Sequence, residues 1–219
     1  MATVLITGGE RGLGLALARA CTDAGHAVAV LCRETGPALD ALAPEILSGA
    51  DVANVASLHR AAAAWGDRGI DILINNAGIM IEDDLERLDI GAVRRQFEVN
   101  ALGPLNVALA FRKRLRRGGR LANISSLLGS IGDNGSGGDY GYRMSKAAQN
   151  MLTANLAIDL AEDGVIVAAL HPGIVATGMT GGAGDPADAV ARDLLAAIAS
   201  LTPEMSGGFY DRNGDALPW

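Results

Sequence analysis

The sequence predicts an α/β protein built on a doubly wound parallel sheet of about seven strands, with helices on both faces. Short β-branched apolar runs alternate with longer amphipathic runs along all 219 residues, the pattern of repeated strand–helix units. Most apolar runs do not alternate with polar residues, as expected for strands that are covered by helices on both sides. Many of the 29 glycines fall in short clusters between these runs, where tight turns are needed.

The expected elements follow one another in a regular order. We expect strands at residues 3–7, 27–32, 45–47, 70–75, 119–125, 165–170 and 208–211. We expect helices at residues 12–24, 54–65, 91–114, 142–161 and 186–200. No repeat, linker or low-complexity segment interrupts this order, and the chain is long enough for a three-layer core. We therefore expect a single domain over residues 1–219.

Charge and composition narrow the classes of partner. A net charge of -7 argues against nucleic acid or an anionic membrane surface. The basic run at residues 112–117 lies at an expected helix end, where cations suit the helix dipole. The uncharged stretch 165–184 contains a histidine, a proline and several glycines, which favour a strand and a loop over a membrane span.

The histidines and cysteines do not form the usual metal or disulfide patterns. His26, His59 and His171 are far apart in sequence, so we expect no metal site. Cys21 and Cys32 are too few and wrongly spaced for a disulfide framework or a zinc site. A reducing, cytoplasmic compartment is the corresponding expectation.

A glycine-rich loop follows the first expected strand. The segment from Thr7 to Gly14 has the sequence Thr-Gly-Gly-Glu-Arg-Gly-Leu-Gly. Backbone N–H groups at the start of the following helix, together with its dipole, would form an anion site suited to a pyrophosphate. Gly8 permits the sharp turn, Gly12 lets the backbone approach the phosphates, and Gly14 lets the helix pack on the sheet. The loop predicts a dinucleotide site, with a glycine-rich turn that binds no ligand as the alternative.

The end of the second expected strand predicts which dinucleotide is bound. A carboxylate there would bind a free ribose diol and repel a 2′-phosphate. This chain has Cys32 and Arg33 instead, and Arg11 lies in the glycine loop, so two guanidiniums can converge on a phosphate. Glu10 and Glu34 are adjacent to these arginines and oppose this interpretation. We expect NADP(H) to be favoured over NAD(H), with ordinary surface arginines as the alternative.

A tyrosine and a lysine lie one helical turn apart in the second half of the chain. Tyr142 and Lys146 at i and i+4 share one helix face. Acid–base work by tyrosine at neutral pH needs its pKa to fall by about three units, or roughly 4 kcal/mol. An ammonium at about 4 Å in an effective dielectric constant of about 20 supplies that order of energy. Tyr140 has Met144 at the same spacing, so it has no such cation.

Several motifs together carry a resemblance to a known family. In chain order they are Thr7-Gly8-x-x-x-Gly12-x-Gly14, Asp51-Val52, Asn75-Asn76-Ala77-Gly78, Asn100, Ser126, Tyr142-x-x-x-Lys146 and Pro172-Gly173-Ile174-Val175-Ala176-Thr177. The whole chain resembles the short-chain dehydrogenases/reductases. Residues 126–131, 137–146 and 209–219 resemble more narrowly the C-factor and sniffer-like carbonyl reductases. The resemblance implies a Rossmann-type dinucleotide-binding fold.

The resemblance implies catalytic roles for four residues. Tyr142 would give its proton to a carbonyl oxygen or remove the proton of an alcohol, and Ser126 would hydrogen-bond the same oxygen. Lys146 would lower the pKa of Tyr142 and bind the nicotinamide ribose. Asn100 would hold a water molecule that links the lysine to solvent. Ser125 is the alternative catalytic serine, and Asn100 has the alternative role of bending its helix.

The resemblance also implies the cofactor contacts. Asp51 would contact the adenine, and Asn75 and Gly78 would line the adenosine ribose, although Asn75 and Asn76 have the alternative role of joining strands. The segment 175–177 would hold the carboxamide. The full set implied to bind the cofactor is Gly8, Arg11, Gly12, Leu13, Gly14, Cys32, Arg33, Asp51, Val52, Asn75, Ala77, Gly78, Tyr142, Lys146, Pro172, Gly173, Val175 and Thr177.

Substrate choice is expected in residues 127–139 and in the short loop after residue 177. Ser126 lies sixteen residues before Tyr142, a longer spacing than in many family members, so residues 133–139 are expected to form a glycine-rich flap. The expected substrate-binding residues are Ser126, Tyr140, Tyr142 and Met179.

The resulting hypothesis is an NADPH-dependent oxidoreductase that transfers a hydride between nicotinamide and a small-molecule carbonyl or alcohol. The alternatives are an NAD-dependent alcohol dehydrogenase and a non-catalytic dinucleotide-binding signalling protein. Apolar positions on the helices expected at 91–114 and 142–161 suggest a homo-oligomer, either a dimer or a tetramer.

Overall fold

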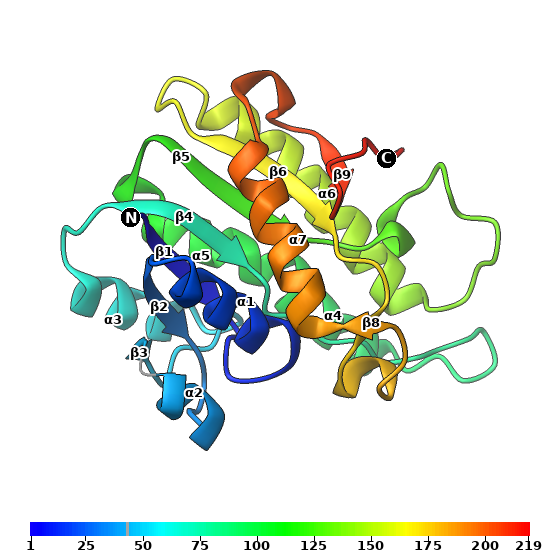
Figure 1. Cartoon of the computed structure of the whole chain (residues 1–219). Helices are drawn as coiled ribbons and strands as arrows, with labels where there is room; N and C mark the ends of the chain where they lie inside the picture. Colours follow the sequence, from blue (N-terminus) through cyan, green and yellow to red (C-terminus); the bar gives the residue numbers. More distant parts are fainter. Residues whose placement is uncertain (43) are drawn as a thin grey trace.

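A parallel seven-stranded sheet lies at the centre of the computed structural model, which describes residues 1–42 and 44–219 (Figure 1). The strands are β1 (Thr3–Thr7), β2 (Ala27–Leu31), β3 (Glu45–Leu47), β4 (Ile70–Asn75), β5 (Leu115–Ile124), β6 (Ile166–His171) and β9 (Phe209–Asp211). Their spatial order is β3-β2-β1-β4-β5-β6-β9. The chain reverses its direction of progress across the sheet between β1 and β4, and a crevice for a ligand forms at such a switch point. The predicted fold class is confirmed.

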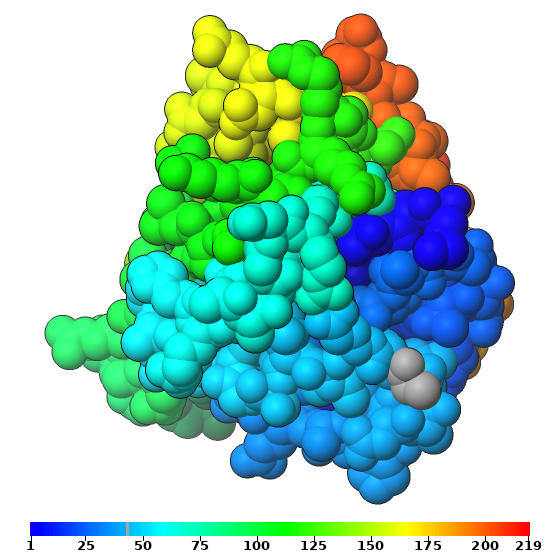
Figure 2. All heavy atoms as spheres, turned by 90° about the vertical axis from the view of Figure 1, so that its left-hand side faces the viewer, coloured from blue at the N-terminus to red at the C-terminus, as the bar shows by residue number. Residues whose placement is uncertain are grey.

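Helices cover both faces of the sheet. One face is covered by α1 (Gly12–Asp23), α2 (Pro37–Leu42) and α7 (Ala187–Ser200). The other face is covered by α3 (Val55–Trp65), α5 (Gly103–Phe111) and α6 (Tyr140–Asp159), and α4 (Ile90–Phe97) packs against α6. In the perpendicular space-filling view, blue and cyan residues from the first third of the chain form one flank of the molecule (Figure 2).

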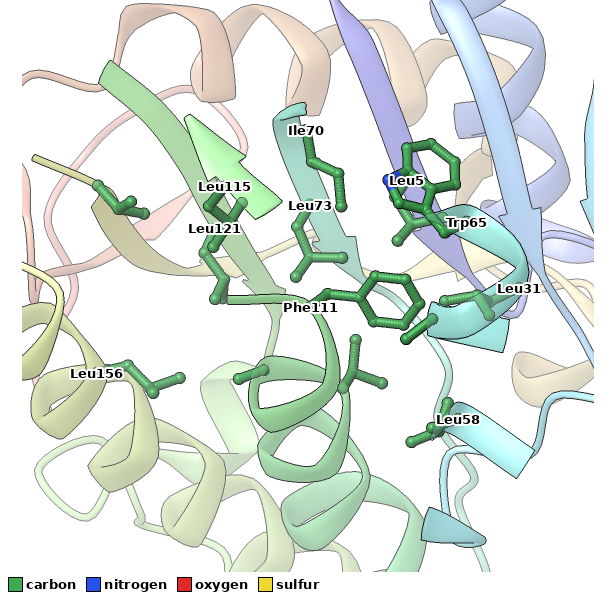
Figure 3. Packing of buried hydrophobic residues seen from close by; sticks show 14 of the residues in the cluster. Leu5, Leu31, Leu58, Trp65, Ile70, Leu73, Phe111, Leu115, Leu121 and Leu156 are labelled. Carbon is green, nitrogen blue, oxygen red and sulfur yellow. The ribbon is translucent and has the colours of Figure 1, made fainter. Parts of the chain in front are cut away.

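Phe111 fills the centre of the core on the α5 side of the sheet. Its ring is fully buried near Leu73 of β4, Leu31 of β2 and Leu58 of α3 (Figure 3). Truncating a buried phenylalanine to alanine typically costs about 3–5 kcal/mol. This packing holds α5 on the sheet and thereby fixes the position of the chain that leads into β5.

The helix predicted over residues 91–114 is interrupted. The segment Glu98–Leu102 is π-helical, and Asn100 lies in it. The Asn100 side chain accepts a hydrogen bond from Ile79 N (2.9 Å) and donates to Ile79 O (2.8 Å) and Ser145 Oγ (3.0 Å). These tertiary contacts join the π-helical segment to the loop after β4 and to α6, and π-turns of this kind are frequent at functional sites.

Helix α5 ends at Phe111, and a 3-10 turn over Arg112–Arg114 carries the helical region to its expected end at Arg114. The Arg114 guanidinium donates to the carbonyl oxygens of Ala62, Gly66 and Ala110, near the carboxyl ends of α3 and α5. One cation thus satisfies carbonyls at two helix ends, where positive charge is favourable. Strand β5 consequently begins at Leu115 rather than at the predicted residue 119.

Two small features were not predicted. They are the six-residue helix α2 and a two-stranded sheet of β7 (Val175–Ala176) and β8 (Asp185–Pro186). The small sheet begins and ends the loop that follows β6. Within the described ranges, no helix is long and apolar enough to cross a bilayer.

Candidate active site

A cavity of about 920 Å³ opens at the carboxyl ends of the central strands. Its volume lies near the upper end of the range that is usual for small-molecule and cofactor sites. The lining comes from the loops after β1, β2, β3, β4, β5 and β6, from the first turn of α1 and from the first two turns of α6. Segments that are far apart in the sequence therefore meet around one space.

Most of the predicted site residues line this cavity. They are Gly8, Arg11, Gly12, Leu13, Gly14, Cys32, Arg33, Asp51, Val52, Ala77, Gly78, Ser126, Tyr142, Lys146, Pro172, Gly173, Val175, Thr177 and Met179. Three predicted residues do not line it, namely Asn75, Asn100 and Tyr140.

The glycine loop is packed so closely that side chains would not fit. Gly8 has a φ of 67°, and a Cβ there would lie 2.9 Å from the Cα of Ala77. A Cβ on Gly14 would lie 2.0 Å from the carbonyl oxygen of Gly8. The side chain of Asn76 donates to the carbonyl oxygens of Thr7 (3.1 Å) and Gly8 (3.0 Å). The loop is therefore held in one conformation by the strand beside it.

The start of helix α1 suits a phosphate. Its N-cap residue, Arg11, makes no side-chain capping hydrogen bond, so no side chain of the cap satisfies the first N–H groups. Gly12 has a φ of 54° and lines the cavity without a side chain. Backbone donors, a helix dipole and a nearby guanidinium form a donor set that fits the pyrophosphate of a dinucleotide.

Charged side chains gather at the end of β2. Cys32 is buried there, while Arg11 and Arg33 are exposed on the rim of the cavity. Burial, with a smaller contribution from the Glu10 carboxylate, raises the pKa of the Cys32 thiol to about 11. Glu10 therefore lies close to this position, and its buried Oε2 has no hydrogen-bond partner. The two guanidiniums are suited to bind a 2′-phosphate, whereas the Glu10 carboxylate would repel it.

Ser126 and Tyr142 meet at the opposite end of the cavity. Tyr142 lies in the first turn of α6, is 8% exposed, and has the Ser126 side chain close enough to act on the pKa of its hydroxyl. The neighbouring Ser125 instead donates to Asn150 Oδ1 (2.6 Å). Of the two candidate serines, the structure therefore places Ser126 against the tyrosine hydroxyl.

Burial shifts the pKa values of the tyrosine and the lysine in opposite directions. Burial raises the pKa of Tyr142 to about 12, although the hydrogen bond from Ser126 partly offsets this rise. Burial lowers the pKa of Lys146 to about 7. Burial, Ser126 and Asp139 are the groups that shift the pKa of Tyr142 here, and the effect of Lys146 on that pKa stays a prediction. The ammonium lies 5.8 Å from the ring centroid and is hydrogen-bonded to Ile124 O and Gln149 Oε1.

Three predicted residues make contacts away from the cavity lining, and the site roles expected for them stay predictions. Asn75 donates to Asn123 Oδ1 (2.8 Å) and joins β4 to β5, as in its alternative role. Tyr140 begins α6 at the Asp83 side chain, which accepts from its backbone N–H. Asn100 lies behind the cavity wall and interrupts its helix, which also matches its alternative role.

Sequence reasoning missed several lining residues. The Nδ1 atom of His171 accepts a hydrogen bond from Leu127 N (3.2 Å), and burial lowers the pKa of His171. Its position directly before Pro172-Gly173 was a usable signal. The missed apolar wall residues include Ile79, Met80, Val99 and Ile174, whereas Leu127 and Leu128 lie in the segment expected to govern substrate choice. The sequence patterns of the missed wall residues are those of ordinary loop or core residues, so only the folded structure identifies them.

Comparisons with known proteins agree with this architecture. A family model described as short chain dehydrogenase matches residues 2–187, and the chain belongs to this family. It is 39% identical to the 1-hydroxy-2-glutathionyl-2-methyl-3-butene dehydrogenase of Rhodococcus sp. (strain AD45), over the full length of both chains. It is also 44% identical to the C-signal protein of Myxococcus xanthus, over 68% of this chain and 93% of that protein.

Solved structures extend the similarity to the whole fold. The carbonyl reductase Sniffer of D. melanogaster superposes with a TM-score of 0.93 at 30% identity and full coverage of both chains. An NADPH-bound carbonyl reductase from chicken fatty liver superposes with a TM-score of 0.91 at 30% identity, over 100% of this chain and 99% of that one. The predicted resemblance is confirmed.

Proposed function

We propose that this protein is an NADPH-dependent oxidoreductase that transfers a hydride between nicotinamide and the carbon of a carbonyl or alcohol. The observation that supports this most strongly is that Ser126, Tyr142 and Lys146 line the same cavity as the glycine loop, with Ser126 acting on the Tyr142 hydroxyl. The names of the similar proteins, which include carbonyl reductases and a dehydrogenase, support the same class of reaction.

In the direction of reduction, Tyr142 acts as the general acid. Its pKa of about 12 keeps the hydroxyl protonated at neutral pH, so the proton is available for the carbonyl oxygen. The bound dinucleotide supplies the hydride to the carbonyl carbon. Ser126 hydrogen-bonds the same oxygen and stabilises the negative charge that develops on it. The product is an alcohol, and the tyrosinate left behind is reprotonated from solvent.

Lys146 acts on the tyrosinate rather than on the resting phenol. At the 5.8 Å between the ammonium and the ring centroid, the attraction is on the order of 3 kcal/mol in an effective dielectric constant of about 20. This energy is available only while the phenolate exists, so it lowers the barrier to proton transfer.

The test is turnover of a panel of aldehydes and ketones with NADPH. We expect Tyr142→Phe to lose about 10²- to 10⁴-fold in kcat and to bind NADPH as tightly as wild type. Tyr140→Phe is the matched control because Tyr140 does not line the cavity. If wild type binds NADPH but reduces no member of the panel, a dinucleotide-binding signalling protein, which the similarity to C-signal favours, replaces the enzyme.

The preference for NADP(H) is a separate part of the proposal. Arg11 and Arg33 support it, and Glu10 supports the alternative use of NAD(H). We expect Arg33→Ala to lower kcat/KM for NADPH by about tenfold and to leave kcat/KM for NADH nearly unchanged. Glu10→Gln should have the opposite effect and raise kcat/KM for NADPH relative to kcat/KM for NADH. Equal use of both cofactors by wild type would contradict the preference.

We further propose a cytoplasmic homodimer formed through α6. The two cysteines are free, which supports a reducing compartment. Met144, Met151 and Ile158 are exposed at seven-residue intervals along α6 and so form one apolar stripe. Light scattering should give twice the chain mass for wild type and the monomer mass for Met151→Glu. A monomeric wild type would rule out the dimer.

A further inference from the structure

A buried glutamine lies directly behind Lys146. Gln149 follows it by three residues on α6 and is fully buried. Its Oε1 atom accepts a hydrogen bond of 2.9 Å from Lys146 Nζ. The same ammonium donates to the carbonyl oxygen of Ile124 on β5 at 2.8 Å. Two acceptors from two different elements therefore hold two of its three N–H donors, and one donor is left for the cavity that Lys146 lines.

The other half of the glutamine amide has no partner. Gln149 Nε2 is buried and has no hydrogen-bond partner among the described residues. An unpaired buried donor destabilises a protein, whereas a leucine or methionine of similar volume would fill the same space without that penalty. Packing therefore does not explain why this position holds a glutamine. The hydrogen bond that its oxygen accepts from the Lys146 ammonium does explain it.

No carboxylate contributes to the environment of Lys146. Tyr142 faces it from the same helix, and β5 presents the backbone carbonyl of Ile124. From the loop after β4, Gly78 lies close enough that a Cβ would be 3.9 Å from Nζ, and Asn100 lies beside it. Asp139 acts on Tyr142 rather than on the lysine. Because burial disfavours the ammonium, two neutral oxygens are the groups that favour its charged form.

We propose that Gln149 is a positioning residue, whose Oε1 atom aims the Lys146 ammonium at Tyr142 and keeps it charged in the buried end of the cavity. The kinetic consequence depends on the proposed function, whereas the effect on the lysine does not.

The charge state of Lys146 can be measured without any activity. The chain contains two lysines, Lys113 and Lys146, so selective ¹³C labelling of lysine gives two Cε resonances to follow by NMR. Lys113 is exposed and serves as the internal reference. We expect Gln149→Leu to lower the pKa of Lys146 by about one unit, because a hydrogen bond to the charged form is lost.

Thr153→Val is the matched control. Thr153 is also fully buried on α6, one turn further along, and accepts from Asn123 Nδ2 (2.9 Å) without touching Lys146. We expect this variant to lose stability and to leave the lysine pKa unchanged.

The kinetic readout is the pH profile of reduction. The limb that falls as Lys146 loses its proton should move to lower pH in Gln149→Leu, while KM for the carbonyl changes little. Gln149→Glu, which keeps an acceptor oxygen and adds charge, should move the limb to higher pH. It provides a second variant if Gln149→Leu does not fold.

Identical titration of Lys146 in wild type, Gln149→Leu and Gln149→Glu would overturn the proposal. If the lysine resonance shifts as expected but no carbonyl is reduced by any variant, the positioning role stands and the proposed function fails.

Discussion

The two ends of the cavity are built differently. At the glycine-loop end, the glycine loop and the segments that follow β2, β3 and β4 form the walls, and Arg11 and Arg33 are exposed on the rim. At the tyrosine end, the buried Lys146 side chain is hydrogen-bonded to a β5 backbone carbonyl and to Gln149 of α6, and Ser126 lies against Tyr142. The first end can bind through geometry and screened charge, whereas the second depends on unscreened interactions between a few atoms. Substitutions should therefore have larger effects at the tyrosine end.

The largest effect is expected for Lys146→Met. We predict a loss of about 10³-fold in kcat, since the tyrosinate loses its neighbouring cation. The free energy of unfolding should rise in this variant, although kcat falls. The native lysine releases its proton near pH 7, whereas the unfolded chain holds it to about pH 10, so the unfolded state binds more protons between these values. The buried ammonium therefore destabilises wild type most at low pH, and the free energy of unfolding of wild type rises as the pH rises through this window.

Thermal unfolding between pH 6 and 9 checks the stability part of that prediction. The unfolding temperature of Lys146→Met should exceed that of wild type most at pH 6, and the difference should shrink towards pH 9. A difference that does not vary with pH would show that the lysine is not titrating in the native state.

Ser125 and Ser126 at the tyrosine end of the cavity can be compared as candidate catalytic serines. Ser126→Ala removes the hydroxyl that touches Tyr142, and we predict a loss of about 10²-fold in kcat. Ser125→Ala removes a hydroxyl that is bonded to Asn150, so its main effect should be on the unfolding temperature. The measurement is kcat at saturating NADPH for both variants. The opposite order of effects would reassign the catalytic serine.

At the glycine-loop end, Gly14→Ala tests whether the backbone itself forms the site. The added Cβ would lie 2.0 Å from the carbonyl oxygen of Gly8, so the loop must move. We predict a loss of about 1–3 kcal/mol of stability and a KM for NADPH raised by about tenfold, with kcat altered less. Gly36→Ala is the control, because a Cβ there meets nothing within 4 Å.

The smallest effect is expected from salt. Raising ionic strength from about 0.05 to 0.5 M shortens the Debye length well below 10 Å and screens the exposed Arg11 and Arg33. We predict a rise of about threefold in KM for NADPH and no change in kcat, because Tyr142 and Lys146 are buried. A salt-dependent kcat would indicate that the tyrosine end is more open to solvent than its burial implies.

Several parts of the fold followed from local patterns. The sheet strands at 3–7, 45–47 and 70–75 were predicted with the bounds that the structure shows, because each is an apolar run between clear turn signals. The helix predicted over 91–114 is interrupted by the π-helical segment Glu98–Leu102 and closes in a 3-10 turn over Arg112–Arg114. Asn100 bonds to Ile79, and Arg114 caps carbonyls as distant as Ala62, so contacts far along the chain decided both.

The same division applies to the candidate site. The glycine loop is visible in the sequence because its geometry is set by consecutive residues. The direction in which a side chain at the end of a strand points depends on the neighbouring strand, which is why Asn75 was placed at the cofactor although it bonds to Asn123.

The sequence by itself determined the fold class, the glycine loop and the family, since these depend on local spacing and on motifs in a fixed order. Only the tertiary structure decided which serine touches Tyr142, and that burial sets the pKa of Lys146 with Gln149 as its partner. The physical reason is that desolvation and hydrogen-bond geometry depend on every element packed around an atom, and spacing along one helix does not specify them.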